Sequence, residues 1–121
     1  MLRFTTKEVN GVLVVAFEAT DENLGEWQTT HRDLLYRMIE SRTDGRVALD
    51  LNDVSYLASS EIGFLVTIKR RIDRRQGRLV LFGVGPYIHE IFQTMNLVKI
   101  LDIVPDYPQA LARLGDGKET K

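Results

Sequence analysis

Two adjacent serines, Ser59 and Ser60, carry the side chains best placed for chemistry, because they lie between a predicted strand and a predicted helix start. A serine hydroxyl at the start of a helix accepts a hydrogen bond from a first-turn N–H group and stabilises the helix by about 1 kcal/mol. A phosphate is also tolerated there, since unpaired N–H groups and the positive end of the helix dipole face it. The pair therefore predicts either a helix N-cap or a phosphorylation switch, in which the phosphate adds about −1.5 to −2 charges.

Other catalytic or metal-binding sets are not expected. The chain has no cysteine, which excludes disulfides, thiolate catalysis and cysteine-ligated zinc. Of the two histidines, we expect His31 at the edge of the core and His89 facing water. No G-x-S-x-G elbow surrounds Ser59 or Ser60, so a serine hydrolase is not indicated. We predict no catalytic residue and no bound metal.

Two further motifs are read as structural. A predicted strand ends in Asp50, Asn52 and Asp53, which are residue types that commonly terminate strands, and they are too few to predict a magnesium site. Residues 83–86, Gly-Val-Gly-Pro, stand where a dinucleotide-binding turn would, but Ile88 occupies the position of its third glycine. We interpret this segment as a tight strand-to-helix turn and expect no cofactor.

A basic cluster follows in the second helix and at the start of the next strand. Its six basic residues surround one acidic residue, Asp73, for a net charge of +5; they are Lys69, Arg70, Arg71, Arg74, Arg75 and Arg78. We interpret this cluster as a solvated helix face, with an acidic partner or a phosphate group as the alternative. No aromatic residues alternate with these charges, so nucleic-acid binding is not expected.

The elements that position these residues follow from hydrophobic periodicity. Asn10-Gly11 between two β-type runs predicts a hairpin. After it, strands alternate with helices. This order, ββαβαβαβα, predicts an α/β fold with a mixed sheet of four or five strands covered by helices. The seam of the second helix is expected at Leu65, Ile68 and Ile72, and Gly77 is expected to end that helix at its C′ position. The predicted strands are residues 4–9, 12–18, 46–51, 79–82 and 99–104. The predicted helices run from 24 to about 41, from 59 or 60 to 77, from 86 onward, and from 106 to 114. The helix that begins at 86 is expected to have Ile88, Ile91, Phe92 and Met95 on its inner face.

Length and composition fit one globular domain. The 121 residues have a net charge of −1, with 44% hydrophobic and 27% charged residues, which argues against a generally basic nucleic-acid binder. We expect a single domain over residues 1–114 and a flexible tail over 115–121. No apolar run approaches a membrane span and the first residues do not resemble a signal peptide, so a cytoplasmic protein without membrane contact is expected.

The chain resembles the STAS domain family, which includes bacterial anti-sigma-factor antagonists. The resemblance rests on the opening hairpin, residues 46–57 before the serines, Ile62-Gly63 after them, residues 77–84 with Pro86, Asn96-Leu97 and the closing residues 108–111. In antagonists of this family the switch motif reads Asp-Ser-Ser/Thr-Gly-Leu-Gly, and the serine after the aspartate is phosphorylated. By that resemblance the phosphorylation site is Ser59, although Ala58 replaces the aspartate and Glu61 replaces the first glycine. The carboxylate of Glu61 is expected to repel the phosphate.

The resemblance implies a binding protein that is not an enzyme and that acts by partner switching. The implied partner is an anti-sigma factor that is a serine-protein kinase of the histidine-kinase-like ATPase type. Phosphorylation of Ser59 would end this association. The expected partner-binding residues are Asp21, Glu22, Ala58, Ser59, Ser60, Glu61, Ile62 and Phe64, with Ile62 and Phe64 supplying apolar contact.

Three alternatives stay open at this stage. A constitutive scaffold subunit of a signalling or transport assembly would need no phosphorylation, and the altered residues Ala58 and Glu61 favour it. A small nucleotide-binding protein would use residues 83–86. A homodimer is compatible both with the partner-switching protein and with the scaffold subunit.

Overall fold

The computed structural model describes residues 2–19, 25–41 and 45–115, and for residues 2, 3, 19 and 25–31 it describes the backbone alone. The expected partner-binding residues Asp21 and Glu22 lie outside these ranges, as do residues 116–121 of the predicted tail and the side chain of His31. The elements in chain order are β1 (Leu2–Val9), β2 (Val12–Ala19), α1 (Gly25–Glu40), β3 (Arg46–Asp53), α2 (Ser59–Arg74), β4 (Arg78–Phe82), α3 (Pro86–Thr94), the short 3₁₀ helix η1 (Leu97–Lys99), β5 (Asp102–Val104) and α4 (Tyr107–Arg113).

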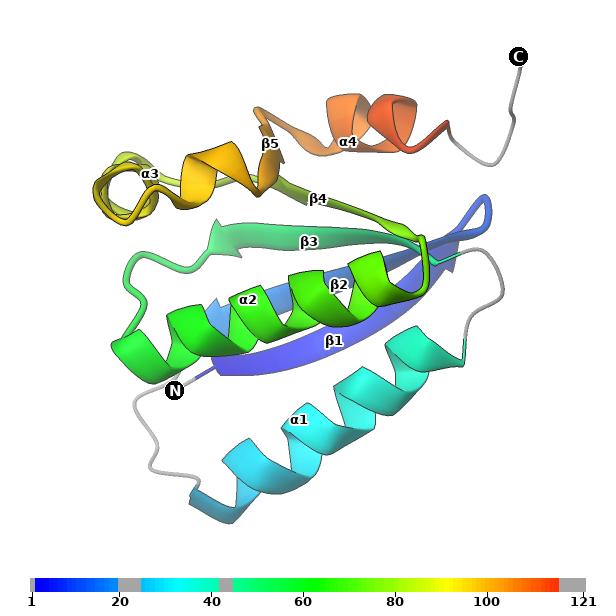
Figure 1. Cartoon of the computed structure of the whole chain (residues 1–121), viewed down its shortest axis with the longest axis horizontal. Coiled ribbons are helices and arrows are strands. Elements are labelled where there is room, and N and C mark those ends of the chain that lie inside the picture. The colour runs from blue at the N-terminus through cyan, green and yellow to red at the C-terminus, as the bar shows by residue number, and fades with distance from the viewer. Residues whose placement is uncertain (1, 20–24, 42–44, 116–121) are drawn as a thin grey trace.

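The described strands form one sheet in the order β1-β2-β3-β4-β5, antiparallel between β1 and β2 and parallel elsewhere. The predicted element order and mixed sheet are thereby confirmed. The hairpin turn has Asn10 at φ 53° and Gly11 at φ 85°, the left-handed pair that a two-residue turn between twisted strands requires. Helices α1 and α2 cover one face of the sheet, and α4 lies on the other face (Figure 1).

The larger core lies between the sheet and helices α1 and α2. The predicted seam of α2 is confirmed, since Leu65, Ile68 and Ile72 are all buried there. Strand β3 alternates as expected: Leu49 and Leu51 face this core, while Ala48 faces the smaller core under α4. The central strand is therefore covered on both faces, which fixes where its carboxyl end and the following loop lie.

The end of α2 differs from the prediction in one position. The left-handed C′ residue is Gln76, with φ 61°, and Gly77 is the next residue. The amides of both donate back to the last turn, Gln76 N to Asp73 O and Gly77 N to Ile72 O, which is the Schellman pattern. Glycine is needed at 77 for another reason: a Cβ there would lie 2.5 Å from the carbonyl oxygen of Gly45.

The strand predicted over residues 99–104 is wrong in its first half. The chain forms η1 over Leu97–Lys99 and only Asp102–Val104 pairs with β4. The cause is Asn96, whose left-handed φ of 61° turns the chain directly after α3. Met95 was expected on the inner face of α3, but it follows the last helical residue and is 51% exposed.

Candidate functional site

The two serines lie in the exposed first turn of α2. The N-cap is Ala58, with extended backbone angles, so Ser59 and Ser60 are the first two helical residues and both side chains are exposed. The predicted helix start is confirmed, but neither serine is the N-cap. Ala58 has no side-chain hydrogen-bond acceptor, so another residue must supply the side-chain cap of the helix.

Glu61 supplies the side-chain cap. Its Oε1 accepts a hydrogen bond from the backbone N–H of Ala58 at 2.8 Å, and the side chain is buried, with 7% of the residue exposed. This is one half of a capping box, in which the third helical residue reaches back to the N-cap amide. The backbone carbonyl of Ala58 in turn accepts from Glu61 N and Ile62 N. Glu61 therefore fixes the junction between the β3–α2 loop and the helix, close to the serine hydroxyls.

The two apolar residues expected at the interface are core residues. Ile62 and Phe64 are each 6% exposed. The ring of Phe64 packs edge-on against Phe17 with centroids 6.0 Å apart, and lies 5.7 Å from the ring of Tyr36. Little of either side chain is available to a partner in this conformation, because the helix seam turns both toward the sheet.

An exposed aromatic pair lies beside the serines and was missed from the sequence. Tyr56, in the β3–α2 loop, and Tyr87, in the first turn of α3, stack with centroids 6.2 Å apart and planes 20° apart. They are 57% and 53% exposed. Figure 1 shows why they meet: the loop that leaves β3 passes the start of α3 before it enters α2. The sequence offered one signal, a tyrosine three residues before Ser59.

Two segments that build this end of the molecule, residues 47–68 and 79–98, contain no lysine or arginine. These two segments form the β3–α2 loop, the first turns of α2 and all of α3, and they present the exposed acidic residues Asp53 and Glu90. We call this region the serine end. A phosphate at Ser59 would therefore find no cation within these two segments.

The basic cluster lies at the opposite end of α2, and part of its charge is paired. Lys69 bonds both carboxylate oxygens of Asp73 at 2.8 Å, and Arg71 bonds Glu40 at 2.9 Å while its guanidinium lies 4.0 Å from the centroid of Tyr36. Arg78 lies 3.9 Å from Asp102. The exposure of the other members, Arg70, Arg74 and Arg75, agrees with the predicted solvated face.

The glycine segment forms the predicted strand-to-helix turn. Gly83 has φ 72°, and a Cβ there would lie 2.5 Å from the side chain of Asn52. Gly85 is the N-cap of α3 and Pro86 its first residue. Local backbone geometry and contact with Asn52 thus account for these residues without a ligand.

Among the described residues, no group of three or more His, Asp or Glu side chains is arranged to hold a metal ion. Likewise, no described helix has the length and apolarity needed to span a membrane.

Known proteins share this fold. The STAS domain family model matches residues 4–110. The chain is 34% identical over 55 residues to the anti-sigma-B factor antagonists of Listeria monocytogenes and Listeria innocua, and each match covers 46% of this chain and 48% of the relative. The chain therefore spans about half the length of these curated relatives.

Solved structures resemble nearly the whole chain. A glutamate-for-serine variant of RsbS from Moorella thermoacetica has a TM-score of 0.79 at 19% identity, covering 94% of this chain and 96% of its own. The unphosphorylated form of SpoIIAA, an anti-sigma factor antagonist, has a TM-score of 0.73. The phosphorylated form, described as the Bacillus cell fate determinant, has a TM-score of 0.64. The identities are 17% and 18%, and the matches cover 92% of this chain and 95% and 98% of theirs. With the family model covering most of the described residues, this chain belongs to the STAS domain family.

Proposed function

We propose that the protein is an anti-sigma-factor antagonist that works by partner switching through the serine end, in the cytoplasm. The observation that carries the proposal is the exposed position of Ser59 in the first turn of α2, directly after the β3–α2 loop. The proposed partner is an anti-sigma factor that is also a serine kinase of the histidine-kinase-like ATPase type. The protein contributes a surface and a phosphate acceptor, and carries out no catalysis itself.

Phosphorylation acts by charge in this proposal. The serine end already presents Asp53 and Glu90, and its two segments hold no lysine or arginine. A phosphate on Ser59 would enter an interface to which those two segments contribute no lysine or arginine. Binding would weaken, because an uncompensated charge is costly to bury and like charges repel. Unmodified Ser59 carries no such penalty, so the unmodified protein is the binding form.

Apolar contact comes from the aromatic pair in this proposal, since Ile62 and Phe64 are buried. Tyr56 and Tyr87 present rigid, half-exposed rings beside the serines, and tyrosine is enriched among residues that dominate binding energy. We expect Tyr87→Ala to weaken partner binding about thirtyfold, or about 2 kcal/mol. Met95→Ala, directly after the end of α3, is the control. Equal affinity of both variants and the wild type would remove the aromatic pair from the interface.

Calorimetric titration with an anti-sigma factor kinase from the same genome tests the switch. Ser59→Ala should bind within about threefold of wild type, because it removes only an exposed hydroxyl, whereas Ser59→Asp should lose over about a hundredfold, or ~3 kcal/mol. Ser60→Asp is the matched control and should lose less. Mass mapping after incubation with the kinase and ATP should find phosphate on Ser59.

A constitutive scaffold is the second candidate, and the capping by Glu61 favours it. The Glu61 carboxylate occupies the first turn of α2 and would repel a phosphate on the neighbouring Ser59. Tight partner binding that is equal for wild type, Ser59→Ala and Ser59→Asp, with no phosphate incorporated, would establish the scaffold and reject the switch.

A further inference from the structure

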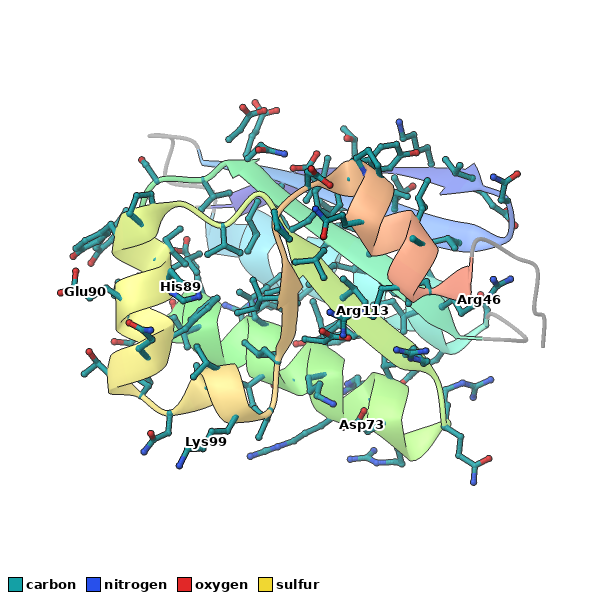
Figure 2. All side chains as sticks on the ribbon, turned by 90° about the horizontal axis from the view of Figure 1, so that it is seen from above. Arg46, Asp73, His89, Glu90, Lys99 and Arg113 are labelled. Atoms are coloured by element: carbon teal, nitrogen blue, oxygen red, sulfur yellow. The ribbon has the colours of Figure 1, made fainter. Side chains whose placement is uncertain are left out.

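A hollow of about 350 Å³ opens on the face of the sheet opposite α2. It exists because α4 is short: Ala110 of this helix and Leu114, the residue directly after it, cover only one part of this face. Figure 2 looks onto this face and shows α4 crossing it toward Arg46. The first residue of α4, Tyr107, forms a wall of the hollow.

The floor follows from the register of the strands. Thr5 pairs with Ala16, Ala16 with Asp50 and Asp50 with Phe82, so these four side chains form one row across β1 to β4. The small side chain of Ala16 leaves the space, and Phe82 gives the row an apolar end. Asp50 is a charged residue in the middle of a central strand, between an alanine and a phenylalanine, where folding alone favours an apolar side chain.

The carboxylate of Asp50 is held in place with one oxygen left over. Its Oδ1 accepts from the backbone N of Asn52 at 2.9 Å and from Asn52 Nδ2 at 2.8 Å. The Asn52 side chain is itself packed against Gly83. Among the residues that the structure describes, none forms a hydrogen bond with Asp50 Oδ2. A preorganised acceptor therefore faces the hollow.

A cation lies on the other side of the same hollow. Lys7 holds its Nζ 5.2 Å from the centroid of the Tyr107 ring. Lys7 is on β1 and one row away from Asp50 on β3, so strand spacing puts their Cα atoms about 12 Å apart. Within the described part of the chain, no ion pair engages either of these two charges. The hollow thus offers an anion and a cation with the apolar residues Val14 and Ala16 of β2 between them.

We propose that this hollow binds a small zwitterion, an α-amino acid with an apolar side chain. Its ammonium group would donate to Asp50 Oδ2, its carboxylate would accept from Lys7, and its side chain would lie on Ala16 and Phe82. Charge-assisted hydrogen bonds of about 2.8 Å are the contacts proposed at each end of this molecule. Few convergent polar groups around an apolar floor are the usual composition of small-molecule sites. This site is independent of the proposed switch.

The test is a nuclear magnetic resonance titration of the full chain with three matched probes. L-leucine carries both charges, isoamylamine lacks the carboxylate, and 4-methylpentanoate lacks the ammonium group. We expect saturable amide shifts around Asn52 and Tyr107 with L-leucine, and binding at least about tenfold weaker for the other two probes. Equal binding of isoamylamine would overturn the zwitterion proposal, and so would shifts that do not saturate or that map elsewhere.

Variants separate the two charges. Asp50→Asn keeps an acceptor for Asn52 and Lys7→Met keeps the aliphatic stem, and each should weaken L-leucine binding at least about tenfold. Asp73→Asn and Lys69→Met remove the same charges from the ion pair on α2, on the other side of the sheet, and should leave binding unchanged. Loss of binding only in the hollow variants supports the site, whereas unchanged binding in them overturns it. Neither result depends on any protein partner.

Discussion

The two ends of α2 are built in different ways. At the serine end a side chain closes the helix: Glu61 accepts from the Ala58 amide, and the neighbouring surface is aromatic and acidic. At the basic end the backbone closes it, through the left-handed Gln76 and the contact between Gly77 and Gly45. A side-chain cap can be altered without moving the core, whereas a backbone contact cannot. The serine end can therefore vary chemically on a helix whose other end is fixed by backbone contact.

The largest effect is expected at the basic end. Gly77→Ala should lower the free energy of unfolding by about 3 kcal/mol, because the added Cβ meets the Gly45 carbonyl at 2.5 Å and backbone must move. Gly63→Ala, inside α2, is the control: no atom lies within 4 Å of the new Cβ, and the helix should gain about 0.5–1 kcal/mol. Urea denaturation measures both. A tolerated Gly77→Ala would mean that the backbone contact does not fix this end.

A smaller loss is expected at the serine end. Glu61→Ala removes the acceptor for the Ala58 amide and should cost about 1–2 kcal/mol. Glu61→Gln keeps a carbonyl acceptor and should cost less. Hydrogen exchange at the Ala58 amide should quicken in the alanine variant. If exchange there stays as slow as in the wild type, Glu61 is not what closes the helix.

The smallest effect is expected from the exposed arginines. Replacing Arg70 and Arg74 together by glutamate should leave the fold intact, because both side chains are exposed and away from the Leu65–Ile68–Ile72 seam. Binding to the proposed anti-sigma factor partner should change by less than about threefold, since these residues lie at the end of α2 opposite to Ser59. A large loss that shrinks at high salt would instead make the basic end a docking surface.

Local patterns predicted the fold well and the site only in part. The hairpin at Asn10-Gly11 and the start of α2 follow from turn chemistry and periodicity, which act over a few residues. The burial of Phe64 depends on Phe17 and Tyr36, and the stacking of Tyr56 on Tyr87 joins two segments far apart in sequence. Such contacts are set by how the sheet is assembled. The failed strand before Leu101 shows the same limit, because one left-handed asparagine outweighed an apolar run.

The absence of lysine and arginine from residues 47–68 also determines how this protein is cut by trypsin. Cleavage after Arg46 and after Lys69 releases one fragment that contains Ser55, Ser59 and Ser60 together. A phosphate measured on that fragment by mass alone does not identify its serine. A second digestion with a glutamate-specific protease, which cuts after Glu61, shortens the fragment without separating the three serines. Assignment of a phosphate at the serine end therefore calls for fragmentation between Tyr56 and Ser60, or for the Ser59→Ala variant as reference.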